Sequence, residues 1–320
     1  NLKATTERRS MRKNLSSPLT RHPENPILTP DQMPFPCSAV YNAGATEYRG
    51  GVLLLLRVED ARRKTDFYVA TSRDGVHFDV ATKPIRYPLG ETEKRLGGKP
   101  HRFDMRITRI GSGYIVCHAV WTSYGSCIGM ARTRDFESFE PFPYLSVPSN
   151  RNAVLFPEKI GGLYARLERP QHIDGTGRTW ISYSRDLEFW GRSLPVALPR
   201  TAWSERKDGP GAIPIRTPEG WLIIYHATCP TASTENYYLG VALLDLKDPS
   251  VVRAAPESFI LAAERPYECV GQVPNVVFSG GAVHMPDGTL NVYYGGADTR
   301  MCLATTTVDK LLQFCRNAPG

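Results

Sequence analysis

One aspartate and a group of basic side chains occur at comparable places along this chain of 320 residues. The acid is Asp104, and the basic side chains are Arg151, Arg169, Lys207 and His226. Cationic donors confined in one site form a binding set for phosphate, which arginine can bind bidentately. Hydrolysis of a glycoside with inversion normally needs two carboxylates, an acid and a base that activates water. A phosphate dianion is already a nucleophile, so one acid and several cations suit phosphorolysis of a glycoside.

These residues belong to two sets that a sequence repeat places at the same end of a sheet. The first set stands at or near the start of the first strand of each repeat: Asn42, Asp104, Asn152, Gly211 and Asn275. The second set stands near the end of the second strand: Arg57, His118, Arg169, His226 and Asp298. Antiparallel strands bring both sets to one rim, which Arg151 and Lys207 join. Taken singly, each of these residues has a simpler explanation as a turn or cap residue, and their convergence depends on the register of the repeat.

The elements that must position these residues are hairpins that recur along the chain. Each repeat has a short strand, a Gly-rich turn and a second apolar strand, as in NAGATEYRGGVLLLLRV, followed by a second similar stretch, as in FYVATSRDGVHF. Equivalent places lie at steps of 61, 51, 60 and 62 residues: Ser72, Thr133, Ser184, Leu244 and Thr306. Two hairpins make a four-stranded antiparallel unit. Five units predict an all-β fold, a five-bladed β-propeller around a central channel.

The chain divides into an N-terminal arm, residues 1–35, and a propeller domain, residues 36–320. The arm is polar and then Pro-rich, and we expect it to wrap the outside of the ring or to close it. Blade one is expected at 38–86, and the later blades end near 148, 200, 262 and the C-terminus. Residues 87–102 form a charged loop of a length that is often functional. The tail VDKLLQFCR is expected to be a last strand or a helical turn.

Composition and charge exclude some classes of protein. The net charge is +7, and a basic cluster in the arm fits a solvated segment or a subunit contact: Arg8, Arg9, Arg12 and Lys13. No aromatic residues interleave these charges, so nucleic acid is not the expected partner. The chain contains no run of eighteen apolar residues and no signal-peptide pattern, so no membrane partner is expected. The seven cysteines lack a CxxC pair and are expected to be reduced, in a cytoplasmic protein. The sequence leaves a homo-oligomer open.

No metal and no organic cofactor is expected, and inorganic phosphate is the expected co-substrate. His118 and His226 have no third ligand at a suitable spacing, and basic residues crowd the same rim. His101, Phe103 and Trp121 are expected either to flank an acceptor sugar or to pack in the core.

At these residues the sequence resembles the mannoside phosphorylases of glycoside hydrolase family 130. The resemblance runs from about residue 22 through all five repeats, in these segments: NAGATEY, LLLLRVED, FDMRIT, NAVLFPEKIGGLYARLERP, KDGPGAIPIRTPEGWLIIYH, YECVGQVPNVVF and YYGGADT. It implies a five-bladed propeller that cleaves β-mannosidic bonds with inversion and gives α-mannose 1-phosphate.

The resemblance also implies roles for single residues. Asp104 would be the catalytic acid, acting through the 3-hydroxyl of the sugar, and four residues would bind phosphate: Arg151, Arg169, Lys207 and His226. Contacts with the substrate are expected from Asn42, Arg57, Asp298, Phe103, His101 and Glu268. The chain departs from the family beside the acid, where Met105 stands in place of the usual Pro or Leu, and Glu168 precedes Arg169 where His or Asp is usual. These departures concern the acceptor subsite, because residues beside the acid commonly shape it.

Three functions follow from different features. The leading one is an inverting β-1,4-mannoside phosphorylase acting on mannosyl-glucose or short mannooligosaccharides. The alternative is a β-mannosidase of the same fold that recruits a pair of glutamates, for which Glu59 and Glu268 are available. The third is a carbohydrate-binding or scaffold propeller, which would not need an acid surrounded by cations. Dependence of sugar release on phosphate discriminates among them.

Overall fold

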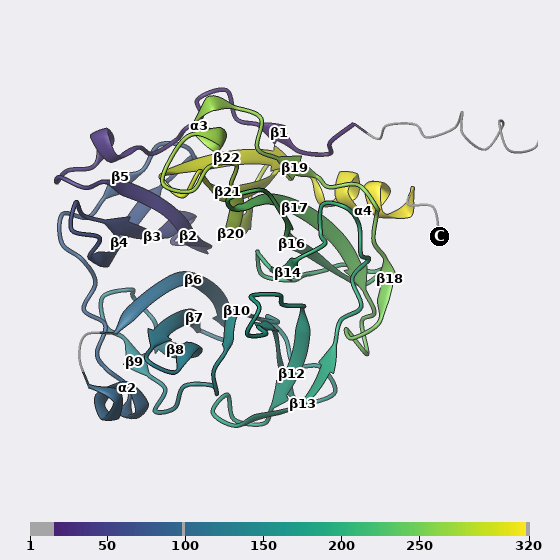
Figure 1. Ribbon diagram of the computed structural model, residues 1–320, viewed down its shortest axis with the longest axis horizontal. Coiled ribbons are helices and arrows are strands. Elements are labelled where there is room, and N and C mark those ends of the chain that lie inside the picture. The colour runs from purple at the N-terminus through teal and green to yellow at the C-terminus, as the bar shows by residue number, and fades with distance from the viewer. Residues whose placement is uncertain (1–15, 98–99, 318–320) are drawn as a thin grey trace, which may run out of the picture.

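Five antiparallel sheets form a ring in the computed structural model, which describes residues 16–97 and 100–317 (Figure 1). Four sheets have four strands each. The sheet of blade four has six, because two short strands share its inner edge and two share its outer edge. Each blade therefore keeps a four-stranded path, and the prediction of a five-bladed β-propeller is confirmed. Within the described ranges, no helix is long and apolar enough to cross a membrane.

The first three blades follow the chain in simple order. Blade one contains β2 (Ala39–Tyr48), β3 (Gly51–Glu59), β4 (Thr65–Ser72) and β5 (Asp79–Val80). Blade two contains β6 (His101–Ile110), β7 (Gly113–Thr122), β8 (Gly125–Thr133) and β9 (Glu140–Pro141). Blade three contains β10 (Asn150–Leu155), β11 (Tyr164–Pro170), β12 (Trp180–Ser184) and β13 (Trp190–Pro195).

The last two blades complete the ring. Blade four contains β14 (Lys207–Pro210), β15 (Ile215–Arg216), β16 (Trp221–Pro230), β17 (Glu235–Leu244), β18 (Val252–Ala254) and β19 (Leu261–Ala262). Blade five contains β20 (Val277–His284), β21 (Leu290–Gly296), β22 (Arg300–Thr306) and, from the other end of the chain, β1 (Thr20–Arg21). The helices are short: η1 (Pro30–Gln32), α2 (Glu91–Leu96), α3 (Pro266–Cys269) and α4 (Val308–Arg316). The tail VDKLLQFCR is thus helical.

The recurring Ser and Thr positions have a local structural cause. The third strands end at the residues that the repeat aligns: Ser72, Thr133, Ser184, Leu244 and Thr306. In the first three blades the hydroxyl accepts a hydrogen bond from the backbone N–H three residues later, at 2.8, 3.0 and 2.9 Å. Short polar side chains that bond their own turn favour such tight reversals. The repeat in the sequence is therefore a repeat of turn chemistry.

The core of the protein consists of apolar clusters between neighbouring sheets. Residues of blades one and two form one cluster, and the pairs two and three, three and four, four and five, and five and one form the others. Each blade thus buries both faces, and removal of one blade would expose two apolar surfaces.

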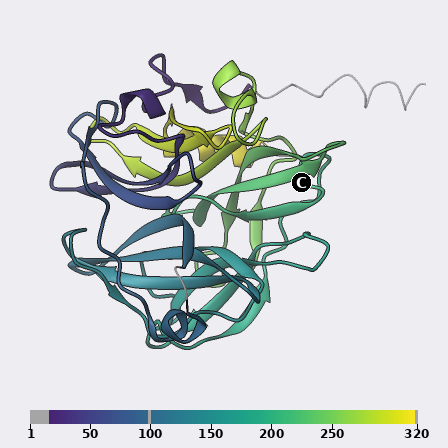
Figure 2. The ribbon, with the colours of Figure 1, turned by 60° about the vertical axis from the view of Figure 1, so that its left-hand side comes forward.

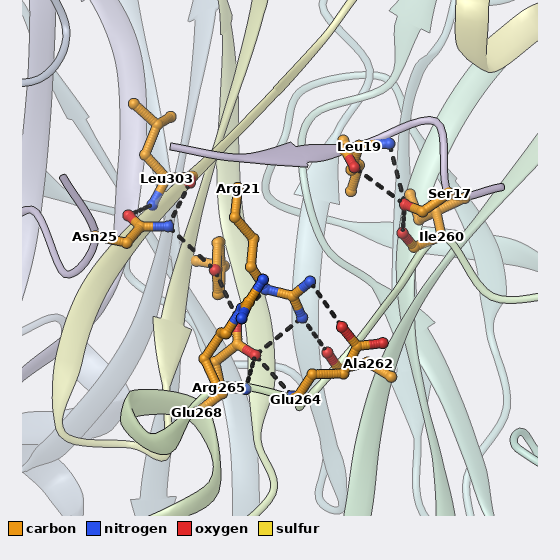
Figure 3. A network of polar contacts seen from close by, with 11 residues as sticks. Ser17, Leu19, Arg21, Asn25, Ile260, Ala262, Glu264, Arg265, Glu268 and Leu303 are labelled. Carbon is orange, nitrogen blue, oxygen red and sulfur yellow. Dashed lines mark hydrogen bonds and ion pairs between the residues drawn. The ribbon is translucent and has the colours of Figure 1, made fainter. Parts of the chain in front are cut away.

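The N-terminal segment closes the ring. β1 pairs with β22 as the outer strand of blade five, and Figure 2 shows this purple segment beside the yellow strands of that blade. Figure 3 shows the contacts around it: Asn25 exchanges two hydrogen bonds with Leu303, at 2.7 and 2.8 Å, and Arg21 pairs with Glu268 at 2.8 Å. Residues 20–21 of the expected arm thus belong to the sheet of blade five. The basic cluster Arg8 to Lys13 lies outside the described residues.

Candidate active site

A cavity of about 460 Å³ lies where the inner strands of the blades meet. We call it the active-site cavity. Residues of all five blades line it: Asn42, Arg57, His101, Phe103, Asp104, Trp121, Arg151, Tyr237, Val276, Phe278 and Asp298. Of the rim residues that the repeat predicted, this set contains Asn42, Arg57, Asp104, Arg151 and Asp298. All the predicted sugar contacts except Glu268 are in this set.

A backbone irregularity in the first strand of three blades aims side chains at the centre. The pairing shifts between Tyr41 and Gly44, between Phe103 and Arg106, and between Arg151 and Val154. The residues inside the shifts have positive φ angles: Asn42 at 48°, Asp104 at 54° and Asn152 at 58°. Asn and Asp tolerate this left-handed conformation better than other non-glycine residues. A bulge re-aims a side chain, so the recurring Asn and Asp residues serve both the backbone and the site.

Asp104 is held by groups from blade one. The Arg57 guanidinium lies 3.3 Å from Asp104 Oδ1, and the Asn42 amide donates to the same oxygen at 3.4 Å. Arg57 also pairs with the Glu59 carboxylate at 2.6 Å and lies over the Tyr41 ring, 4.5 Å from its centre. The Tyr41 hydroxyl donates a hydrogen bond to the Glu59 carboxylate. Arg57, which Glu59 and Tyr41 hold in place, thus holds the Asp104 carboxyl group in turn.

Asp298 is a second carboxyl group in the same cavity. Asn42 Nδ2 donates to Asp298 Oδ1 at 3.4 Å as well as to Asp104. Burial raises the pKa of Asp298 to about 7; nearby Arg57 opposes this rise and Asp104 adds to it. Near neutral pH this carboxyl group is therefore partly protonated and can donate or accept a hydrogen bond.

The basic residues from blades three and four form one group beside the cavity. Arg151 and Arg169 face each other across β10 and β11, and the Arg169 guanidinium donates to His226 Nε2 at 2.8 Å. Burial and then Arg151 lower the pKa of Arg169, to about 10. Gly209 makes room for this pair, because a Cβ there would lie 2.7 Å from the His226 ring and 3.0 Å from Arg169. Of the four predicted phosphate ligands, only Arg151 lines the cavity directly.

His226 differs from the predicted cation. Burial and then Arg169 lower its pKa well below the usual value, so the imidazole is neutral at pH 7. Since Nε2 accepts from Arg169, Nδ1 carries the proton. That nitrogen has no hydrogen-bond partner among the described residues, and neither do the buried Nε atoms of Arg151 and Arg169. Three unpaired N–H donors in one buried group would suit an anion.

Lys207 is buried and already paired. Its ammonium lies 2.8 Å from both oxygens of Glu235, and Arg206 reaches the same carboxylate at 2.7 Å. Burial lowers the pKa of Lys207, while Glu235 opposes that effect. Sequence reasoning did not find Glu235, which lies 28 residues from Lys207 and carries no local motif.

Aromatic and imidazole rings form part of the cavity lining. His101, Phe103 and Trp121 all lie there, and Arg57 reaches over the Phe103 ring at 5.6 Å. Burial and then Arg57 lower the pKa of His101. Tyr237 and Phe278 also line the cavity, with their rings 6.2 Å apart, and the sequence repeat missed both. Tyr237 stands in the third strand of its blade, whereas the search for rim residues used only the first two strands of each repeat.

The predicted position of His118 on the rim is corrected. His118 lies opposite the bulge of β6, so Ala119 and not His118 is the residue equivalent to Arg57 and Arg169. A shift of one residue moves a side chain to the other face of a strand. His118 is accordingly buried against Tyr87, whose hydroxyl lies 3.0 Å from Nδ1, and it does not line the cavity.

Glu268 lies apart from the cavity. Its carboxylate takes two bonds from Arg21, at 2.8 and 2.9 Å, and one from the Tyr294 hydroxyl at 2.8 Å (Figure 3 shows the Arg21 contacts). These contacts join the N-terminal strand to α3, so the expected contact with substrate is replaced by a structural role. Glu59 is bound to Arg57 and does not line the cavity either. In the described part of the chain, no three His, Cys, Asp or Glu residues are grouped to hold a metal ion.

Known mannoside phosphorylases resemble this chain in sequence. A family model described as beta-1,4-mannooligosaccharide phosphorylase matches residues 7–317. The chain is 33% identical to the β-1,4-mannooligosaccharide phosphorylase of Ruminococcus albus, over 93% of this chain and 90% of that protein. It is 36% identical to the 1,2-β-oligomannan phosphorylase of a Thermoanaerobacter species, over 88% and 94%.

A solved structure shows the same arrangement of blades. The β-1,2-mannobiose phosphorylase from Listeria innocua superposes with a TM-score of 0.83 at 29% identity, over 93% of this chain and 99% of that one. The chain belongs to glycoside hydrolase family 130, the family of the mannoside phosphorylases.

Proposed function

We propose that this protein cleaves β-linked mannosides with inorganic phosphate, with inversion, to give α-D-mannose 1-phosphate and the released sugar. The observation that carries the proposal is the Asp104 carboxyl group, held by Arg57 and Asn42, beside a buried group of N–H donors from Arg151, Arg169 and His226. The family supports the same reaction. The proposed reaction needs no metal or organic cofactor.

In the proposed reaction, each group of residues in and beside the cavity has its own role. Phosphate is held by the basic group and attacks the anomeric carbon, so that a C–O bond to phosphate forms as the glycosidic C–O bond breaks. Asp104 supplies the proton that the leaving oxygen needs, relayed through the 3-hydroxyl of the mannosyl ring. Asn42, Arg57 and Asp298 bind that ring. Arg57 and Asn42 also hold the Asp104 carboxyl group in place, and such positioning contributes to rate.

The proposed linkage is β-1,4, in mannosyl-glucose or short mannooligosaccharides. The description of the family model and the relative from Ruminococcus albus support it. Relatives named for β-1,2-linked substrates match about as well, so β-1,2-mannosides are the second candidate. The acceptor sugar would lie against His101, Phe103 and Trp121, because sugar rings pack on aromatic faces and these residues line the cavity.

A hydrolase of the same fold has less support from the geometry. Neither Glu59 nor Glu268 lines the cavity, and each already makes an ion pair with an arginine. An inverting hydrolase would need a second carboxylate free to activate water. Among the described residues, Asp298 is the one other carboxyl group in the cavity lining, and Asn42 ties it to the same part of the site as Asp104.

The deciding experiment compares sugar release with and without phosphate. β-1,4-mannobiose, mannosyl-glucose and β-1,2-mannobiose are incubated with the protein, and the products are separated by anion-exchange chromatography. We expect α-mannose 1-phosphate only when phosphate is present, with the β-1,4-linked substrates preferred. Equal release of free mannose without phosphate would refute the phosphorylase and favour the hydrolase. Preference for β-1,2-mannobiose would refute the linkage alone.

A further inference from the structure

A groove separate from the active-site cavity lies between blades two and three. It consists of two adjoining cavities of about 680 and 310 Å³ that share Val147, Asn150, Glu168 and Ser193. The larger volume is within the usual range for small-molecule sites. None of the four shared residues lines the active-site cavity. Figure 1 shows β12 and β13, which form much of one wall, toward the outside of the ring.

The floor of the groove is a buried ion pair. Arg166 lies 2.7 Å from Glu168, and both side chains are about 6% exposed. The strand register makes them equivalent to Leu54 and Leu56 of blade one, which are fully buried in an apolar cluster. A buried ion pair at positions that suit leucine does little for stability. Such a departure from the pattern of the other blades is expected at functional sites.

The polar floor extends to groups that can meet a ligand. The Ser182 hydroxyl donates to Glu168 and lies 2.9 Å from the Ser193 hydroxyl, which stands on the exposed strand β13. Asn150 lines both cavities and is 9% exposed, and its buried Oδ1 has no hydrogen-bond partner among the described residues. An unpaired buried amide oxygen is costly unless a ligand or water donates to it.

Aromatic rings line both cavities of the groove. Trp180 lines the larger cavity. Tyr144 and Phe189 line the smaller one; they are 54% and 67% exposed, with ring centres 6.0 Å apart. Arg166 lies over the Trp190 ring at 4.1 Å, which holds a further aromatic group against the floor. Exposed aromatic rings in a groove usually mark a binding surface.

We propose that this groove binds a neutral saccharide chain of two or more units. The charges that line the larger cavity balance, Glu168 and Glu205 against Arg178 and Arg200, so the groove favours no net charge. Carboxylate, amide, hydroxyl and guanidinium groups between aromatic rings match the alternating hydroxyl and C–H surfaces of a sugar. The groove would hold a long mannoside near the active-site cavity. The choice of mannoside as ligand rests on the proposed function.

The test is a calorimetric titration of the Asp104→Asn protein with β-1,4-mannotetraose, and in parallel with β-1,2-mannotetraose. Loss of the acid in this variant prevents turnover during the measurement. We expect two classes of sites. Trp180→Ala should weaken one class about tenfold or more, because an aromatic contact and its desolvated surroundings are lost. Ser193→Tyr should block the same class by bulk without removing any buried group.

Matched variants keep the outcomes distinct. Trp121→Ala, in the active-site cavity, should weaken only the other class. Trp180→Ala with Asp104 intact should keep kcat/KM for mannobiose within about twofold, below the effect of a single lost contact. If the titration shows a single class of sites that is lost in Trp121→Ala and unchanged in Ser193→Tyr, the proposal that the groove binds saccharide is refuted. The proposed function is not affected by that result. Absence of binding at either place, together with absence of phosphorolysis, would overturn both.

Discussion

The raised pKa of Asp298 predicts that this carboxyl group costs stability as the pH rises. The ordinary value is 3.8, and burial raises it to about 7 in the folded protein. Well below the ordinary value the group is protonated in both the folded and the unfolded state. As the pH rises from there to about 7, the unfolded chain ionises freely while the folded protein resists, so stability is lost. Asp298→Asn removes the ionisable proton, and the variant should gain in stability over the wild type across this interval.

The size of the effect follows from the shift. Three pKa units at 1.36 kcal/mol each give an upper limit of about 4 kcal/mol. The Asp298 side chain is partly exposed, so solvent screens part of this, and about 1–3 kcal/mol is expected at pH 8. For a chain of this size that corresponds to a rise in Tm of roughly 2–6 °C.

Thermal unfolding of wild type and Asp298→Asn at pH 4, 5, 6, 7 and 8 measures this directly. The difference in Tm between the two proteins should grow with pH and level off above pH 7. Asp79→Asn, at the exposed position of strand β5, is the control for the loss of a surface carboxylate. A Tm difference for Asp298→Asn that does not change with pH would refute the reasoning. The loss of stability would then not come from ionisation of the partly buried Asp298 carboxyl group.

The remaining predictions concern the acid, the basic group and the closure of the ring. Asp104→Asn should lower kcat by about 10²–10⁴ while Tm stays near that of wild type, and retention of a tenth of kcat would remove Asp104 from the role of acid. Arg151→Ala and Lys207→Ala should raise the KM for phosphate about ten- to a hundredfold, and the KM for mannoside much less, in initial-rate assays; the reverse order would show that these roles are wrong. Glu235→Gln removes the carboxylate that competes with phosphate for Lys207, so the KM for phosphate should fall, and an unchanged or higher value would contradict that competition. Arg21→Ala breaks the largely buried pair that ties β1 to α3 and should cost about 2–4 kcal/mol in urea unfolding with kcat unchanged; a loss of activity in the folded variant would place this pair in the site after all.

The fold was predictable because turn chemistry repeats. S/T-x-D turns follow the third strands of the first three blades, at steps of 61 and 51 residues, and their hydrogen bonds fix where each of these strands ends. A spacing of this kind can be recognised in the sequence without knowing any long-range contact. The ring closure by residues 20–21 was left undecided because two paired residues carry no periodic signal, and their partner strand lies more than 280 residues later.

The candidate site was predictable where a residue is tied to the repeat. Asn42 and Asp104 stand in bulges that demand a left-handed backbone, and this local demand left a visible pattern of Asn and Asp. The same bulges caused the error at His118, because an extra residue in one strand changes which partner residue shares its face. Glu268 was placed by its segment alone, and Val276 and Phe278 of that segment line the cavity whereas Glu268 does not.

By itself, the sequence determined the blade count, the inner strands and most of the polar residues at the centre, since local periodicity and turn preference act over a few residues. Only the tertiary structure decided the charge states and the partners. Arg169 contacts His226 across two blades, Glu235 holds Lys207, and burial sets the pKa values of His226 and Asp298. These properties depend on distances between strands that are far apart in the chain and on the solvent that packing removes. No local pattern encodes either quantity.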